Sequence, residues 1–235
     1  MIFESEIQDI VRRTHNVKSF QVRAPAEASY QAGQFMLVTI KVDQTLVNKY
    51  LSISSSPTQK GLIEFTKKIT ASDFSQTLDR MKPGGWVKID MPKGAFTLDK
   101  ADAKIAFLSG GIGITPIYSI CRYVMDEKLD KDIILLYGNR TEHDIVFKEE
   151  LEQMSRDHAR FRVVHTLEAP QDASGWKGRT GFISEAMIRE EIPDYSGRTF
   201  FVCGPPGMVK VLSELLINQL HLPPEQLVKE NFMGY

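Results

Sequence analysis

Apolar and polar positions follow one another in short runs over the first hundred residues, and these runs predict strands. Gln34–Lys41 is a strand-like run that follows Gly33 and ends before the polar residues from Asp43. Turn residues such as Pro83 and Gly84 separate later segments of the same character. Several short strands at close spacing predict a small antiparallel barrel. The other predicted strands are Lys49–Ser55, Gly61–Ile69 and Trp86–Met91.

From Lys104 the pattern changes to strands that alternate with helices. Asp132–Tyr137 is an unbroken apolar run, which is typical of a strand buried on both faces of a parallel sheet. Such a domain places ligands at the carboxyl ends of its strands. We therefore expect an α/β domain after a join near Lys100–Lys104, which divides the chain into residues 1–100 and 101–235. The other predicted elements are strands at Ile105–Leu108, Phe161–Leu167, Thr199–Cys203 and Leu227–Phe232, and helices at Pro116–Glu127, Ile183–Glu191 and Met208–Gln219.

Two local signals predict where helices of the second domain begin. Pro116 is expected at the first helical position, where its missing N–H costs least. Thr141 and Asp144 have the spacing of a capping box and precede a helical stretch that runs to about Arg156.

Composition and charge exclude several classes of protein. Hydrophobic residues make up 42% and charged residues 25% of the chain, as in an average globular protein. The net charge of -1 removes the general electrostatic reason to expect a nucleic-acid partner. Two cysteines, Cys121 and Cys203, cannot build a disulfide framework or a four-cysteine metal or iron–sulfur site, so no metal site is predicted.

The chain carries no pattern of an exported or membrane-spanning protein. Its first ten residues are polar and acidic, unlike a signal peptide. No apolar run approaches the ~18 residues that a membrane span needs. We therefore expect a cytoplasmic protein with no membrane span.

The strongest chemical signal is the glycine-rich run Gly110–Pro116 between a predicted strand and a predicted helix. Glycines let the backbone approach a pyrophosphate, and the free N–H groups at the start of a helix favour its negative charge. Tight packing of a strand–turn–helix unit also selects glycine, so this run alone does not decide between the two. It differs from the usual dinucleotide fingerprint because Pro116 replaces the third glycine.

A second glycine turn, Cys203–Met208, also follows a predicted strand. Cys203 is expected to point into a crevice, although a small buried thiol before an ordinary loop is the alternative. Two such turns at the ends of two strands favour a shared ligand crevice.

The barrel half contributes a third signal, Lys49–Pro57, in which a cation and several hydroxyls stand beside apolar residues. This composition suits a planar ligand that bears a phosphate. An edge strand with solvated serines is the alternative, and Phe74, Ser75 and the Lys67–Lys68 pair add little on their own.

These segments, in this order, resemble the ferredoxin-NADP reductase family of flavoprotein reductases, which includes the cytochrome b5 reductases and the flavin reductases. The runs Gly110–Pro116 and Cys203–Met208 are specific motifs of the family. Gly84–Phe96 is similar to its barrel-closing segment, and Trp176–Gly181 recurs in its flavin-reductase branch. The resemblance implies an N-terminal antiparallel β-barrel that binds flavin, followed by a C-terminal α/β domain with a parallel sheet that binds NADH or NADPH.

The resemblance implies one group of side chains around the flavin, which is expected to be FAD, with FMN as the alternative. Lys49 replaces an arginine and would contact the flavin phosphate, with its charge kept and bidentate geometry lost. Leu51 falls where the family has an aromatic side chain that stacks on the ring, so this position departs from the family. Ser52 matches a serine that hydrogen-bonds near flavin N5. The other implied flavin contacts are Thr66, Lys67, Phe74, Ser75 and Thr115.

A second implied group binds the nicotinamide nucleotide. Cys203 would lie beside the reactive carbon, and Glu230 resembles a near-terminal carboxylate that relays protons, with an exposed strand-end Glu as the alternative. Tyr235 would cover the ring, or would be frayed. The catalytic candidates are Ser52, Cys203 and Glu230, of which Ser52 and Cys203 act by positioning. The nucleotide-binding candidates are Gly110, Gly111, Gly113, Arg140, Cys203, Gly204, Pro205 and Met208.

The expected reaction moves a hydride from the nicotinamide to the flavin and then passes electrons to an acceptor. NADPH-selective relatives place a Ser-Arg pair after the third strand of the α/β domain, where this chain has Thr166–Glu168. Because a carboxylate repels a phosphate, NADH is favoured over NADPH. Arg140 is the opposing observation, since it could reach a phosphate from another side.

Several alternatives remain open at this point. The chain could reduce free flavin as a substrate, which Leu51 and Trp176–Gly181 favour. It could instead be an electron-transfer subunit that docks on an oxygenase component, a dehydrogenase or a ferredoxin. Residues 1–100 carry 14 basic and 10 acidic side chains, and this excess could steer an acidic protein towards the barrel. A non-enzymatic nucleotide-sensing module would keep Gly110–Pro116 but would not need both Ser52 and Cys203.

Overall fold

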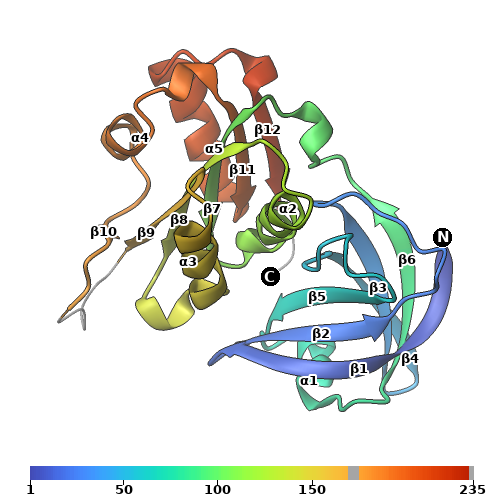
Figure 1. The fold of residues 1–235 in the computed structure, drawn as a ribbon. Helices are drawn as coiled ribbons and strands as arrows, with labels where there is room; N and C mark the ends of the chain where they lie inside the picture. The colour runs from blue at the N-terminus through green and yellow to red at the C-terminus, as the bar shows by residue number, and fades with distance from the viewer. Residues whose placement is uncertain (169–174, 233–235) are drawn as a thin grey trace.

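The computed structural model describes residues 1–168 and 175–232 and contains two six-stranded sheets (Figure 1). One sheet is built from the N-terminal part of the chain and the other from the C-terminal part. The predicted position of Tyr235 lies outside the described residues.

The N-terminal sheet is antiparallel throughout and follows the strand order β4-β3-β6-β1-β2-β5. Alternate side chains of β3, namely Met36, Val38 and Ile40, point into its core and are fully buried. A single bridge between Ile53 and Phe65 brings the two edge strands together, so the sheet curls into a barrel. Its strands are β1 (Ile2–Thr14), β2 (Val17–Arg23), β3 (Phe35–Val42), β4 (Thr45–Ser52), β5 (Leu62–Lys68) and β6 (Trp86–Lys93).

One helix, α1 (Asp73–Arg80), closes the barrel. Ser72 is its N-cap, and the Ser72 hydroxyl accepts a hydrogen bond from the Ser75 backbone N–H. Phe74 and Leu78 face the barrel core and are buried, so one apolar face anchors the helix.

The C-terminal sheet is entirely parallel, with the order β10-β9-β8-β7-β11-β12. Apolar side chains of β7 alternate between its two faces: Ile105 and Phe107 point one way and Ala106 and Leu108 the other. Every strand of the sheet's centre is therefore buried on both sides, as the unbroken apolar runs predict. The strands are β7 (Lys104–Gly110), β8 (Asp132–Asn139), β9 (Phe161–Leu167), β10 (Arg179–Thr180), β11 (Thr199–Gly204) and β12 (Leu227–Asn231).

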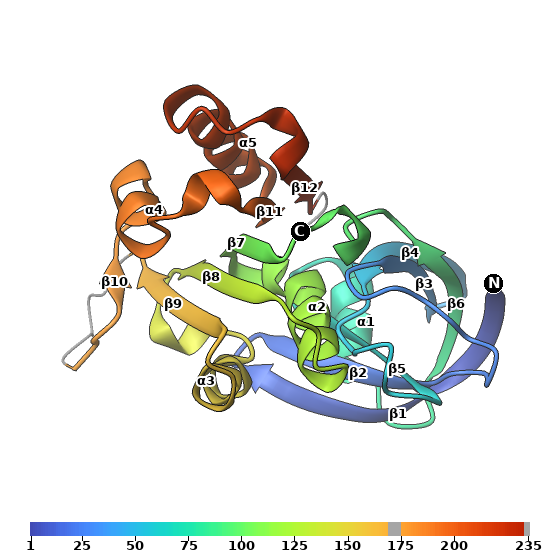
Figure 2. The ribbon, with the colours of Figure 1, turned by 45° about the horizontal axis from the view of Figure 1, so that its top comes forward.

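Helices cover both faces of the parallel sheet. Helices α2 (Ile114–Asp126) and α3 (Lys148–Asp157) pack on one face. Helices α4 (Glu185–Glu191) and α5 (Pro206–Glu214) pack on the other. A π-helical turn, Leu215–Gln219, extends α5. In both views, α2 lies between the parallel sheet and the barrel (Figures 1 and 2).

Most predicted elements are confirmed, with four omissions. Strands β1, β2 and β10 and helix α1 are absent from the sequence-based prediction. Strand β1 buries one side chain completely, Ile7, so it lacks the apolar run that marks the other strands. The predicted strand from Lys49 is shifted, because β4 runs from Thr45 to Ser52.

The residues predicted to mark helix starts occupy other positions in the structure. Pro116 is the third residue of α2 and not the first. The capping box of Thr141 and Asp144 is present, but it caps a short 3₁₀ turn. Helix α3 begins only after Phe147, whose left-handed backbone (φ +59) redirects the chain.

Contacts across the two sheets' boundary are both apolar and polar. The rings of Phe96 and Phe201 meet edge to face with centroids 5.1 Å apart. Ser119 on α2 donates a hydrogen bond to the Ser55 carbonyl at 2.6 Å. The boundary between residues 1–100 and 101–235 falls in the connection from β6 to β7, and this division stays a prediction. Among the described residues, no helix is long and apolar enough to cross a membrane.

Candidate functional site

The chain reverses its direction of travel across the parallel sheet next to β7. From β7 the strands progress through β8 to β9, and β11 then returns to pair with the other side of β7. Ligands of open α/β sheets bind at such a switch point, beyond the carboxyl ends of the strands. The turn Gly111–Gly113 follows β7, and Gly204 ends β11. Both glycine motifs predicted from the sequence therefore meet at the switch point.

A pocket of about 1060 Å³ opens at these carboxyl ends. Gly110 and Gly111 line it from β7 and its turn, Arg140 from the end of β8, and Pro205 and Met208 from the turn after β11. This volume suits a ligand as large as a dinucleotide segment. The pocket thus collects five of the predicted nucleotide-binding residues in one place.

The barrel also forms part of this pocket. His15, Asn16 and Val17, from the hairpin between β1 and β2, and Lys68 at the end of β5 line the same cavity. Strand β5 packs against the Gly111–Gly113 turn. The pocket is therefore shared between the two halves of the chain.

Close packing at the switch point requires glycine at position 113. A Cβ atom there would lie 2.5 Å from the Cys203 carbonyl oxygen and 2.5 Å from the Gly204 Cα. Gly111 has a positive φ of +53 with open space around it, so its backbone faces the pocket without a side chain. The Tyr137 hydroxyl donates a hydrogen bond to the Gly111 carbonyl at 3.0 Å and accepts one from the Val146 N–H at 3.3 Å. Tyr137 therefore links the glycine turn to the segment before α3 through its hydroxyl.

Cys203 and Glu230 are register partners on the parallel strands β11 and β12. In-register neighbours of a parallel sheet point to the same face, so the two side chains lie next to each other. Ser109 on β7 is the partner of Cys203 on its other side, and its buried hydroxyl has no hydrogen-bond partner in the described part of the chain. The two catalytic candidates predicted for the nucleotide side are thus brought together.

Burial changes the ionisation of both groups. It raises the pKa of Glu230 from 4.5 to about 7. Burial, reinforced by Glu230, raises the pKa of Cys203 well above its usual value. Cys203 is completely buried and is not among the residues that line the pocket. The pair therefore consists of a neutral thiol beside a carboxyl that titrates near neutral pH.

On the barrel, Lys49 and Leu51 lie two residues apart on β4 and so share one face of the strand. Lys49 is exposed and Leu51 is half-buried. Ser52 is 5% exposed, and its hydroxyl has no hydrogen-bond partner among the residues that the structure describes. An unsatisfied buried hydroxyl costs free energy unless another molecule supplies its partner.

Strand β5 adds Thr66 and Lys67, both buried. Burial, together with the neighbouring charges of Lys49 and Lys68, lowers the pKa of Lys67 to about 8. The Lys67 ammonium donates to the Lys68 carbonyl at 2.8 Å. A buried ammonium beside two other lysines is a site that an anionic ligand would stabilise.

The remaining flavin candidates lie in first turns of helices. Phe74 and Ser75 are in the first turn of α1, where Phe74 packs into the barrel core and Ser75 is buried. Thr115 is in the first turn of α2, and its hydroxyl donates to the Ile112 carbonyl at 3.1 Å. These three residues occupy helix N-termini, where backbone N–H groups favour anions.

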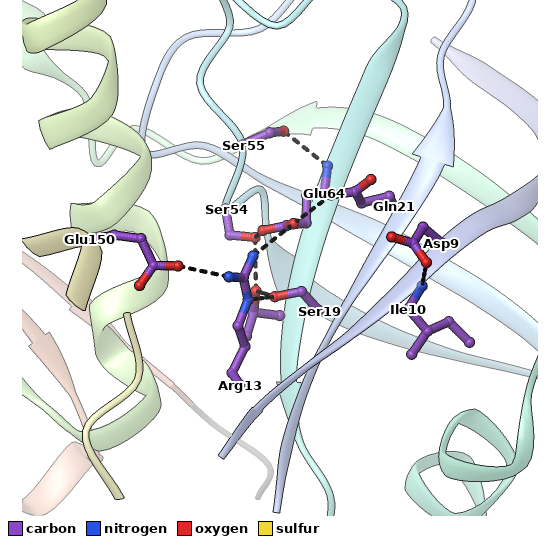
Figure 3. Close-up of polar contacts among 10 residues, drawn as sticks. Asp9, Ile10, Arg13, Ser19, Gln21, Ser54, Ser55, Glu64 and Glu150 are labelled. Atoms are coloured by element: carbon purple, nitrogen blue, oxygen red, sulfur yellow. Dashed lines mark hydrogen bonds and ion pairs between the residues drawn. The ribbon is translucent and has the colours of Figure 1, made fainter. Parts of the chain in front are cut away.

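The sequence prediction missed a polar cluster between the barrel and α3 (Figure 3). Arg13 at the end of β1 contacts Glu64 on β5 and Glu150 on α3. No local motif marks this cluster, because the members are as many as 137 residues apart in sequence.

Comparisons with known proteins agree with this arrangement. The sequence model of the oxidoreductase FAD-binding domain matches residues 4–98, and that of the oxidoreductase NAD-binding domain matches residues 107–214. NADH-cytochrome b5 reductase 1 of Dictyostelium discoideum is 31% identical over 206 residues, which cover 85% of this chain and 71% of that protein. The chain belongs to this family of flavoprotein oxidoreductases.

Other proteins that are similar to this chain differ from it in length. The glycine betaine monooxygenase reductase subunit of Chromohalobacter salexigens is 30% identical over 88% of this chain, and the chain spans 58% of the length of that relative. The ferredoxin reductase in carbazole 1,9a-dioxygenase has a TM-score of 0.84 and 26% identity over 99% of this chain and 70% of its own. The cytochrome b5 reductase domain of Ulva prolifera nitrate reductase shares the fold, with a TM-score of 0.86 at 22% identity over 98% of this chain and 97% of that one.

The residues present fit the two cofactors of the family. Ser52 offers a buried hydroxyl that lacks a partner in the described residues, and Lys67 offers a buried cation. Gly111 lines the shared pocket with open space where a side chain would stand, and Gly113 lets the turn pack against the end of β11. The barrel residues therefore suit a ring system that carries a phosphate, and the glycine turn of the parallel sheet suits a dinucleotide.

Proposed function

We propose that the chain oxidises NADH, passes the hydride to FAD held on the barrel, and delivers the electrons to a redox acceptor. The observation that supports this most directly is the contact between β5, which carries Thr66 and Lys67, and the Gly111–Gly113 turn. A flavin beside β5 and a nucleotide on that turn would lie against each other. When both cofactors are bound, the nicotinamide supplies a hydride and the flavin accepts it.

The protein's own contribution is to bind, to orient and to exclude water. Ser52 donates its hydroxyl to the flavin ring, and Lys49, Lys67 and Ser75 hold the phosphate-bearing part, with Thr66, Phe74 and Thr115 around it. Cys203, a neutral thiol that does not line the pocket, would support the nicotinamide site from behind, and its neighbour Glu230 would hold or release a proton there. Orientation of two reactants at about 3–3.5 Å is the main rate effect expected of such a site.

NADH is the favoured donor because Glu168, at the end of β9, lines the nucleotide pocket. Its carboxylate disfavours a second phosphate on the ribose. Arg140 lines the same pocket and keeps NADPH as the alternative donor.

The acceptor is proposed to be a redox protein, such as a ferredoxin or an oxygenase component. Two relatives support this: one is a reductase subunit of a monooxygenase and another is a ferredoxin reductase in a dioxygenase. A cytoplasmic location and the division into domains 1–100 and 101–235 are part of the same proposal.

A second candidate function is the reduction of free flavin. Leu51 is aliphatic and half-buried on the face of β4 that also carries Lys49. Without an aromatic ring to stack on, a flavin would be held less tightly and could leave after reduction.

The experiment that separates these functions starts from the purified chain loaded with FAD and passed through a desalting column. Our proposal expects flavin to remain bound and NADH to be oxidised when ferricyanide, cytochrome c or a ferredoxin is offered. Colourless protein that oxidises NADH only with added flavin would make the second function correct. Absence of NADH and NADPH oxidation with every acceptor and flavin would reject both.

A further inference from the structure

Arg13 lies where the barrel meets helix α3 and touches both. It is the penultimate residue of β1, directly before the hairpin whose His15 and Asn16 line the nucleotide pocket. Its side chain is 18% exposed. The three nitrogens of its guanidinium are used on three different partners, which lie on three different elements.

Two of these partners belong to the barrel. Arg13 Nε donates to the Ser19 hydroxyl at 2.8 Å, and Nη2 donates to Glu64 Oε2 at 3.2 Å. The third is on the other domain: Nη1 donates to Glu150 Oε1 of α3 at 2.8 Å. Figure 3 shows the guanidinium of Arg13 with Ser19 and Glu64 on one side and Glu150 on the other. A planar fork with fixed donor directions is suited to hold three groups at once.

The barrel contacts close into a ring of hydrogen bonds. The Ser19 and Thr66 hydroxyls are 2.7 Å apart, and those of Thr66 and Ser54 are 2.9 Å apart. Ser54 then donates to Glu64 Oε1 at 2.9 Å, and Glu64 returns to Arg13. Thr66 stands on the strand that packs against the Gly111–Gly113 turn, and Ser54 follows Ser52 by two residues. The ring therefore includes segments that our proposed function places at the flavin.

Aromatic packing fixes the other side of the guanidinium. The Arg13 Cζ lies 4.9 Å from the centroid of the Phe147 ring, a distance at which a cation and a ring attract. Phe147 stacks in turn on Tyr118 of α2, with centroids 3.9 Å apart and planes at 6°. Helix α2 begins at the nucleotide turn, so Phe147 links Arg13 to the helix that follows that turn.

We propose that Arg13 is a positioning residue that fixes the NAD-binding domain on the flavin-binding barrel through Glu150. An isolated surface ion pair would contribute little. Here the pair is partly buried, is shared with Glu64 and Ser19, and joins the hairpin of the pocket to α3. Its kinetic consequence rests on the proposed function, whereas the tie between the domains does not.

Glu150→Gln is the variant that tests this tie. Its side chain is 36% exposed, and its replacement leaves the barrel contacts of Arg13 in place. Arg13→Gln is less informative, since it would leave Glu64, 6% exposed, without its cation. Arg13→Lys keeps a charge for Glu150 but cannot reach all three partners. Glu185→Gln is the matched control, because it breaks the Arg189–Glu185 pair of equal length within α4.

The first measurement is amide hydrogen exchange on the protein without cofactors. Glu150→Gln should accelerate exchange severalfold in residues 14–17 and in α3, because the neutral amide weakens the charge-assisted hydrogen bond that ties the two segments together. Glu185→Gln should leave these amides unchanged. Equal exchange in Glu150→Gln and the parent protein would overturn the proposal.

The second measurement is the limiting rate of flavin reduction at saturating NADH. We expect it to fall about tenfold in Glu150→Gln, since a small displacement of the reactants lowers the rate strongly. The limiting rate of Arg13→Lys should lie between those of Glu150→Gln and the parent protein. The affinity for flavin should not change in either variant. A lower melting temperature with an unchanged limiting rate would mean a merely structural role and would overturn the kinetic part. A parent protein that transfers no hydride, with the exchange result intact, would reject the proposed function and leave the tie standing.

Discussion

Glu230 is the carboxyl group whose ionisation the fold shifts into the neutral range. Burial raises its pKa from 4.5 to about 7. Between these two values the folded state holds a proton that the unfolded state has released. The contribution of Glu230 to the free energy of unfolding therefore falls as the pH rises from about 4.5 to 7.

We expect Glu230→Gln to lack this decrease, because its side chain does not titrate. The difference in the free energy of unfolding between the variant and the parent should grow by roughly 1–2 kcal/mol over this range, less than the full shift implies because the side chain is only half-buried. Urea unfolding of both proteins at pH 5 and pH 8 measures it. A constant difference between the two pH values would show that the carboxyl is not perturbed.

Alanine at position 113 should lower the stability more than alanine at position 111, although the two glycines are only two residues apart. Gly113→Ala would push a Cβ against backbone atoms of Cys203 and Gly204, which should cost about 2–3 kcal/mol. Gly111→Ala meets open space and pays only for its positive φ, about 1 kcal/mol. Denaturant unfolding of the two variants checks this order, and equal losses would refute the packing argument.

At the scale of elements, Tyr137 joins β8 to the nucleotide turn and to the segment before α3. Tyr137→Phe removes the donor to the Gly111 carbonyl and leaves the Val146 N–H, which is buried, without its acceptor. We expect a loss of about 1–2 kcal/mol in stability and a Kd for NADH that rises severalfold. Calorimetry with NADH provides the second value. Unchanged nucleotide affinity would mean that the hydroxyl supports the fold but not the turn.

The elements of the α/β domain could be predicted because burial on both faces leaves long apolar runs such as Asp132–Tyr137. Strand β1 could not, since its long exposed part alternates charged and apolar side chains and only Ile7 is fully buried. Helix α1 could not be predicted either, because it is short and the serines at its start, including the N-cap Ser72, are also typical of loops.

At the scale of the whole molecule, some parts of the candidate site could be predicted from local sequence and others depend on the tertiary structure. The glycine turns were visible because close backbone approach selects glycine locally. The neighbourhood of Cys203 and Glu230 depends on the pairing of β11 with β12, and the Arg13 cluster on a contact between the two domains. Neither leaves a spacing that a single sequence displays.

The preference between the two nucleotides depends on the charges that surround the whole pocket. Repulsion between Glu168 and a ribose phosphate at an exposed site is on the order of 1 kcal/mol, which corresponds to about fivefold in kcat/KM. We expect NADH to be preferred by at least this factor and Glu168→Gln to reduce it. Arg140→Gln is the control for the opposing charge. A preference of the parent protein for NADPH would contradict the assignment.

The most direct test of the account is anaerobic mixing of the FAD-loaded protein with NADH while the absorbance of oxidised flavin is followed. We predict a rapid, saturable loss of that absorbance, because the pocket at the switch point and strand β5 bring the two cofactors together. Flavin that stays oxidised with both NADH and NADPH, and with FMN or riboflavin in place of FAD, would contradict it.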